Sequence, residues 1–144
     1  MFRTIVVGVD GSECSARSLD LACELAKLHG GEIHLVHSPE LVTVRMAFAG
    51  EGVVDVPSDD QKLTAGKKVM EQATAAASAK GITPATTTIG EDGPVDDILT
   101  IVQLYGADLI VTGRRGLSSV GGLFLGSTSQ KLAQSADCPC LTVK

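Results

Sequence analysis

Short segments rich in β-branched residues alternate along the whole chain with longer segments that repeat apolar residues at helical spacing. Strands are predicted at residues 3–9, 32–38, 83–89, 108–112 and 141–143, and helices at 15–29, 59–80, from 94 onward and at 127–135. Such an alternation favours parallel strands joined by right-handed helical crossovers. We therefore expect an α/β fold: a single-domain three-layer sandwich around a five-stranded parallel doubly wound sheet with the strand order 3-2-1-4-5.

The composition supports one globular domain and argues against some classes of partner. The 144 residues are 44% hydrophobic, which is enough for one sizeable core. The formal net charge is −5 and the basic residues are scattered, so nucleic acid is not an expected partner. No apolar segment approaches the roughly 20 residues of a membrane span, and the interval between Arg3 and Asp10 is too short for a signal peptide. We expect a cytoplasmic protein that is not itself a membrane protein.

The residue types that bind transition metals do not form a recognisable site in the sequence. Cys14, Cys23, Cys138 and Cys140 are expected to be reduced thiols, and the Cys-Pro-Cys spacing at 138–140 is wrong for a redox or zinc element. His34 and His37 are three residues apart on a predicted strand, so their side chains should point to opposite faces. A metal site shared by these two histidines is therefore not expected.

The predicted topology places a ligand at the carboxyl ends of the first and fourth strands, where the winding of the sheet reverses. Gly113-Arg114-Arg115-Gly116 follows the fourth strand, and Gly126-Ser127-Thr128-Ser129 opens the next helix after nine further residues. Glycines let the backbone approach a ligand, and the free N–H groups of a helix start attract anions. Together with the two arginines, this pattern predicts a binding site for a phosphate ester.

Several well-known phosphate and hydrolase motifs are absent. Gly121 to Gly126 has the glycine spacing of a Walker A loop, but Ser127 stands where the lysine should be. The dinucleotide-binding Gly-x-Gly-x-x-Gly and the Gly-x-Ser-x-Gly of acyl hydrolases are missing. No residue is therefore assigned a catalytic role.

The remaining pattern, Gly-x-x-Gly-x9-Gly-Ser, occurs together with Val7-Gly8-Val9-Asp10-Gly11-Ser12 at the end of the first strand. In this combination, and over its whole length, the chain resembles the ATP-binding branch of the universal stress protein family. The resemblance implies ATP with Mg²⁺ as the cofactor. By position, the resemblance implies that Gly8, Val9 and Asp10 line the nucleoside and that Val36 faces the adenine. It implies that the ribose and phosphates are wrapped by Gly113, Arg115 and Gly116, with Thr112 as a further candidate. It also implies that the phosphates are held by Gly126, Ser127, Thr128 and Ser129.

Asp10 has two alternative roles. A carboxylate near phosphates is repulsive unless it bonds a ribose hydroxyl or meets the phosphates through a metal ion such as Mg²⁺. The other interpretation is that Asp10 caps the turn before the first helix. The residues alone leave both roles open, and metal ligands are not assigned.

Two further segments suggest contacts with other chains. Residues 39–57 have no helical pattern, and Val42, Val44, Met46 and Phe48 alternate with more polar residues, which favours a lid or a subunit contact, with local disorder as the alternative. The strand at 141–143 should lie at an edge of the sheet, where unpaired backbone groups invite a second copy. We expect a homodimer through this strand, in agreement with the family resemblance, either alone or as half of a tetramer.

The function expected from these features is that of an ATP-binding regulatory or stress-response protein, a nucleotide-dependent sensor read by an unidentified protein partner, with at most slow ATP hydrolysis. The alternatives are a nucleotide-independent dimerisation or interaction module, and a slow ATPase or phosphotransfer enzyme. The chain has neither the Ser-Gly-Gly-x-Asp-Ser nor the His-x-Gly-His motif that adenylyl-transferring relatives of this fold would carry.

Overall fold

A computed structural model describes residues 1–39, 58–116 and 125–144 of the chain. Strands and helices alternate in the order β1 (Thr4–Gly8), α1 (Glu13–His29), β2 (Glu32–His37), α3 (Asp59–Ala79), β3 (Thr86–Ile89), α4 (Pro94–Tyr105), β4 (Leu109–Gly113), α5 (Ser127–Ser135) and β5 (Cys140–Val143). The segment predicted to form a lid or a subunit contact, residues 39–57, lies outside the described residues except for Pro39, as does most of the spacer between the two glycine motifs.

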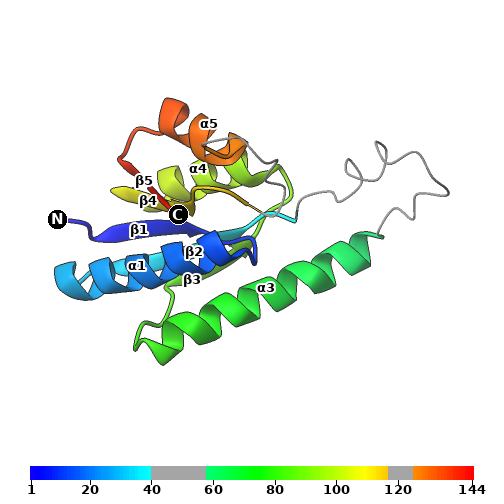
Figure 1. Cartoon of the computed structure of the whole chain (residues 1–144), viewed down its shortest axis with the longest axis horizontal. Helices are drawn as coiled ribbons and strands as arrows, with labels where there is room; N and C mark the ends of the chain where they lie inside the picture. The colour runs from blue at the N-terminus through cyan, green and yellow to red at the C-terminus, as the bar shows by residue number, and fades with distance from the viewer. Residues whose placement is uncertain (40–57, 117–124) are drawn as a thin grey trace.

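The strands form one five-stranded parallel sheet in the order β3-β2-β1-β4-β5, which confirms the predicted topology. Helices α1 and α3 cover one face of the sheet, and α4 and α5 cover the other (Figure 1). Successive residues of β1 point to opposite faces, so Ile5 and Val7 pack in the core beneath α1 and α3, whereas Val6 packs beneath α4 and α5. Burial on both faces explains why β1 and β4 are nearly continuous apolar runs.

Local sequence signals set the helix boundaries. The side chain of Ser12 accepts the N–H of Ser15 at 3.2 Å and caps α1, which ends at Gly30 in the left-handed conformation with a φ of 62°. Pro94 occupies the first turn of α4, as predicted, and Gly106 ends that helix with a φ of 63°. In the described part of the chain, no helix is both long enough and apolar enough to cross a membrane.

Strand β3 begins later than the prediction of residues 83–89. Pro84 has no N–H to donate to a β-ladder, and only the N–H of the next residue, Ala85, donates to the carbonyl oxygen of Ile33, at 2.8 Å. The regular strand therefore starts at Thr86. It forms one edge of the sheet, and β5 forms the other, as expected.

His34 and His37 lie on opposite faces of the sheet, as their spacing predicts. The ring of His34 stacks on Tyr105 of α4 with a centroid distance of 4.1 Å, and its Nδ1 lies 2.8 Å from the hydroxyl of Thr86. The ring of His37 is on the α3 side, with Nδ1 2.7 Å from the carbonyl oxygen of Val9. Both histidines are thus occupied by contacts within the fold.

Candidate functional site

The ends of β1 and β2 form one side of the predicted site. Strand β1 lies between β2 and β4, so Gly8, Val9 and Asp10 follow the central strand at the point where the winding reverses. The N–H of Val9 donates to the carbonyl oxygen of Val36 at 2.9 Å, which brings these two predicted residues together. The side chain of Val36 is only 1% exposed and packs beneath α4, so its backbone is the part nearest to Val9.

Gly8 and Gly113 permit close packing of the strands against helices. A Cβ on Gly8 would lie 2.9 Å from the Cδ1 of Ile98 in α4. A Cβ on Gly113 would lie 2.9 Å from the Cβ of Cys14 and 3.0 Å from the backbone nitrogen of Ser15 in α1. The sequence suggested that glycines stand here to admit a ligand, and the structure adds a packing reason for both.

Asp10 joins the first turn of the site to the loop after β4. Its Oδ1 accepts the N–H of Ser12 at 2.8 Å, which is the turn-capping role that the sequence left as one alternative. Its own N–H donates to the hydroxyl of Ser15 at 3.1 Å. A Cβ on Gly116 would lie 2.6 Å from Oδ2 of Asp10, so this oxygen faces the backbone of the loop after β4.

The two glycine motifs of the phosphate pattern are held together through the backbone of Arg114. The N–H of Arg114 donates to the carbonyl oxygen of Val143 at 2.6 Å, and its carbonyl oxygen accepts the N–H of Gly126 at 2.7 Å. A Cβ on Gly126 would lie 3.1 Å from that same carbonyl oxygen. The start of α5 is therefore fixed beside the end of β4, and the predicted Gly113–Gly116 and Gly126–Ser129 segments meet.

The N-terminus of α5 has the properties of an anion site. Its N-cap is Gly126, which has no side chain to form a cap bond with the N–H groups of the first turn. The first turn of α5 holds no acidic residue, whereas those of α1, α3 and α4 do. Negative charge is favoured at such a helix start by the backbone dipoles.

The hydroxyl groups of the predicted site differ in what they can offer a ligand. Ser129 is buried, and its hydroxyl donates to the carbonyl oxygen of Gly113 at 2.8 Å and lies 3.3 Å from that of Thr112. These two side chains therefore serve the packing of α5 on β4, and Ser129 can serve a ligand through its N–H. Ser127 is exposed and Thr128 is half-buried, so their hydroxyls can reach a ligand.

The two loop arginines, Arg114 and Arg115, carry buried donors. The Nε atoms of Arg114 and Arg115 are buried, and neither has a hydrogen-bond partner in the residues that the structure describes. A buried N–H group without a partner costs about 1–3 kcal/mol, more when the group is charged. An anionic ligand at the adjacent start of α5 would satisfy guanidinium donors of this kind.

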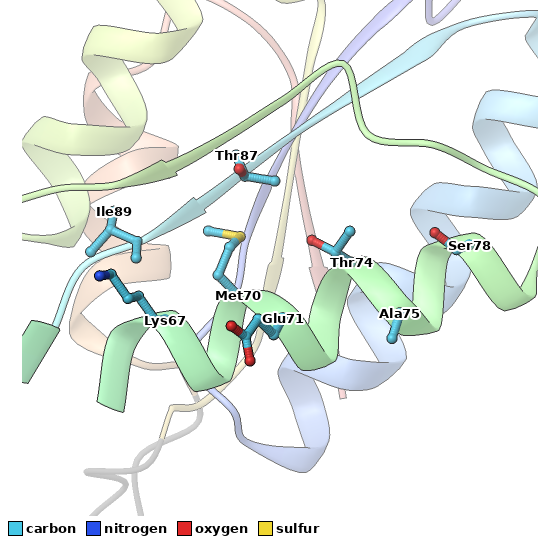
Figure 2. Close-up of a pocket in the computed structure, with 8 residues that line it drawn as sticks. All are labelled: Lys67, Met70, Glu71, Thr74, Ala75, Ser78, Thr87 and Ile89. Atoms are coloured by element: carbon cyan, nitrogen blue, oxygen red, sulfur yellow. The ribbon is translucent and has the colours of Figure 1, made fainter. Parts of the chain in front are cut away.

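Two other hollows are described in the molecule, and the larger of them lacks these features. A groove of about 470 Å³ lies between α3 and the edge strand β3, where Met70 points toward the sheet and Lys67 lies beside Ile89 (Figure 2). A smaller pocket of about 150 Å³ lies between α1 and α3, with Val9 and Gly11 in its lining. The α3–β3 groove is larger, but its lining includes no helix start and none of the glycines of the two motifs.

Comparison with known proteins finds similarity that extends over the whole chain. The model of the universal stress protein family matches residues 1–144. The universal stress protein YxiE of Bacillus subtilis is 35% identical over 150 residues, with 100% of both chains covered. A solved universal stress protein from Archaeoglobus fulgidus has a TM-score of 0.75 at 26% identity, covering 100% of both chains. A universal stress protein solved in complex with cAMP has a TM-score of 0.72 at 27% identity, covering 99% of this chain and 97% of the other.

Proposed function

The chain belongs to the universal stress protein family, and on that premise we propose that it is a regulatory protein that binds an adenine nucleotide, ATP with Mg²⁺, between the ends of β1 and β4. The observation that carries this proposal is the pairing of the α5 start with two buried arginine Nε atoms, since the described residues supply neither a side-chain cap for that helix nor a hydrogen-bond partner for those atoms. The similar universal stress protein solved with cAMP supports a nucleotide as the ligand class. The absence of acidic residues from the first turn of α5 favours the phosphate end at this helix.

Each predicted residue has a place in this proposal. The N–H groups of Ser127, Thr128 and Ser129 bind the phosphates, with Gly126 as the N-cap. The guanidinium groups of Arg114 and Arg115 add donors to the phosphates, beside Gly116. The nucleoside lies against Gly8, Val9, Asp10 and Val36, and Thr112 and Gly113 support the site from β4.

The residues present are compatible with Mg²⁺ bound through the nucleotide. The described residues contain no group of three or more His, Cys, Asp or Glu side chains that could hold a metal ion by themselves. Mg²⁺ is commonly held by one or two carboxylates together with substrate phosphates, and Asp10 supplies one carboxylate facing the loop after β4. When bound, the ion would neutralise the repulsion between that carboxylate and the phosphates.

The chain is suited to binding ATP more than to hydrolysing it. Ser127 replaces the Walker lysine, and one oxygen of Asp10 already accepts the N–H of Ser12. We therefore propose at most slow hydrolysis, with the bound nucleotide acting as a signal to a protein partner in the cytoplasm. The dimerisation-module alternative is less favoured, because among residues 1–39, 58–116 and 125–144 nothing other than a ligand is available to pair with the buried Nε atoms of both loop arginines.

The test is calorimetric titration of nucleotide-free protein with ATP and with adenosine, each with and without Mg²⁺, while released phosphate is measured. We expect tighter binding of ATP than of adenosine, strengthened by Mg²⁺, with negligible phosphate release. In Arg115→Gln, ATP affinity should fall by about tenfold while adenosine affinity is unchanged. Arg3→Gln is the matched control, because Arg3 is exposed at the other end of β1. Equal affinity for ATP and adenosine would contradict the proposed phosphate site.

A further inference from the structure

Asp97 is a buried acidic residue that the proposed nucleotide contacts do not use. It lies in α4 and is only 7% exposed. Its Oδ2 accepts the hydroxyl of Ser38 at 2.5 Å, and its Oδ1 accepts the N–H of Asp92 at 3.2 Å. A buried carboxyl group is costly unless hydrogen bonds compensate it, and an apolar side chain would fill the same space without that cost. The residue is therefore a candidate for a role beyond packing.

The chain makes room for this carboxyl group at Gly90. A Cβ on Gly90 would lie 2.0 Å from Cγ of Asp97 and 2.1 Å from its Oδ2, so the carboxyl group occupies the space that a side chain at position 90 would need. Ser38 follows β2, and Gly90 and Asp92 follow β3. The carboxyl group of Asp97 thus links α4 to the segments that leave two neighbouring strands.

Hydrogen bonds extend from this link to the end of the central strand. The N–H of Gly90 donates to the carbonyl oxygen of His37 at 2.8 Å. Nδ1 of the His37 ring lies 2.7 Å from the carbonyl oxygen of Val9, and the N–H of Val9 donates to Val36 at 2.9 Å. A continuous row of contacts therefore crosses the carboxyl edge of the sheet from α4 through β3 and β2 to β1.

This row ends at the residues that the proposed function assigns to the nucleoside, Val9 and Val36. The residues assigned to the phosphates are held on the other side of β1, through the Arg114 peptide, β5 and α5. We propose that Asp97 is a positioning residue for the base: by fixing Ser38 and the turn after β3, it sets the geometry of the wall that recognises adenine. This inference rests on the proposed nucleotide site and adds to it the group that controls base selectivity.

The test compares base selectivity with phosphate binding in Asp97→Asn, which keeps the shape of the side chain but cannot accept both hydrogen bonds. Calorimetry gives the affinities for ATP, GTP and inorganic tripolyphosphate. We expect the ratio of ATP to GTP affinity to fall by at least about threefold, with tripolyphosphate affinity unchanged. Asp96→Asn is the matched control, because Asp96 is exposed in the same turn of α4 and carries the same charge. It should leave all three affinities unchanged.

If Asp97 had a purely structural role, its replacement would lower the affinity for all three ligands together or for none of them. A folded Asp97→Asn protein with an unchanged ratio of ATP to GTP affinity would overturn the inference. Ser38→Ala removes one partner of the carboxyl group and provides a second test should Asp97→Asn fail to fold. It should shift the ratio in the same direction, and an unchanged ratio there would equally overturn the inference. Failure of the unmodified protein to bind any nucleotide would instead overturn the proposed function.

Discussion

Gly116 and Asp10 approach each other so closely that a side chain at position 116 has no room: its Cβ would lie 2.6 Å from Oδ2 of Asp10. The segments that follow β1 and β4 are thereby brought into one site, although Gly116 lies 106 positions after Asp10 in the chain. The contact also turns one oxygen of Asp10 toward the loop, while the other holds the N–H of Ser12 at 2.8 Å. The proposed ligand contacts and the geometry of the turn therefore both depend on the carboxyl group of Asp10.

Gly116→Ala should weaken ATP binding with little effect on stability. The added methyl group displaces the end of a flexible side chain, Asp10, rather than backbone, so the free energy of unfolding should change by less than about 1 kcal/mol. The displaced carboxylate no longer holds its position beside the phosphates, and ATP affinity should fall by about tenfold. Calorimetry and urea unfolding measure the two effects. Unchanged affinity in a folded variant would remove Gly116 and Asp10 from the site.

Gly113→Ala should lower the stability of the fold more than Gly116→Ala does. Its Cβ would meet the Cβ of Cys14 at 2.9 Å and the backbone nitrogen of Ser15 at 3.0 Å, and backbone atoms cannot move aside without shifting α1. We expect the free energy of unfolding to fall by about 1–3 kcal/mol, measured by urea unfolding beside Gly116→Ala. A variant as stable as the unmodified protein would show that α1 and β4 are not packed as described.

The stability of the fold should decrease at alkaline pH because of Cys23. Burial raises the pKa of this thiol above its ordinary value of 9.0. Above pH 9.0 the unfolded chain loses the proton while the folded protein keeps it, so deprotonation favours the unfolded state and stability falls as pH rises. Cys23→Ala removes the thiol, so the difference in unfolding free energy between the two proteins should narrow from pH 8 to pH 10. Parallel curves over this range would contradict burial of the thiol.

The expected dimer can be tested at the free edge of β5. The N–H groups of Ile110 and Arg114 donate to Pro139 and Val143 at 2.9 and 2.6 Å, so the alternation of a parallel ladder turns the backbone groups of Thr142 toward the unpaired edge. Thr142→Pro removes a donor from that edge without breaking a bond to β4. Sedimentation should show a folded monomer for Thr142→Pro and a dimer for Thr142→Val. A dimeric Thr142→Pro protein would place the interface elsewhere.

Sequence periodicity predicted the alternation of strands and helices, and the strand order followed from the general topology of doubly wound sheets. The β-branched runs and the glycine and proline signals at Gly30 and Pro94 are local, and each acts on neighbouring residues. The start of β3 could not be predicted from the local sequence, because the N–H that Pro84 lacks matters only once β2 lies beside it. The position of the glycine motifs in this alternation predicts a ligand site between the ends of β1 and β4, and that site stays a prediction.

The partners of individual side chains could not be predicted in the same way. The hydroxyl of Ser129 serves the carbonyl of Gly113 rather than a ligand, and Ser38 meets Asp97 across 59 positions of the chain. Such contacts depend on how helices pack on the sheet, and no periodicity records them. The same holds for Gly8, whose missing Cβ makes room for Ile98 of α4.

The most direct test of the phosphate site is a titration of ¹⁵N-labelled protein followed by NMR at the backbone amides of Ser127, Thr128 and Ser129. ATP should shift these three resonances strongly, and adenosine should leave them in place, because only the phosphates reach the start of α5. The amides of Lys67 and Met70, which line the groove between α3 and β3, serve as the internal control. Shifts confined to that groove, or no shift at the start of α5 on saturation with ATP, would contradict the account.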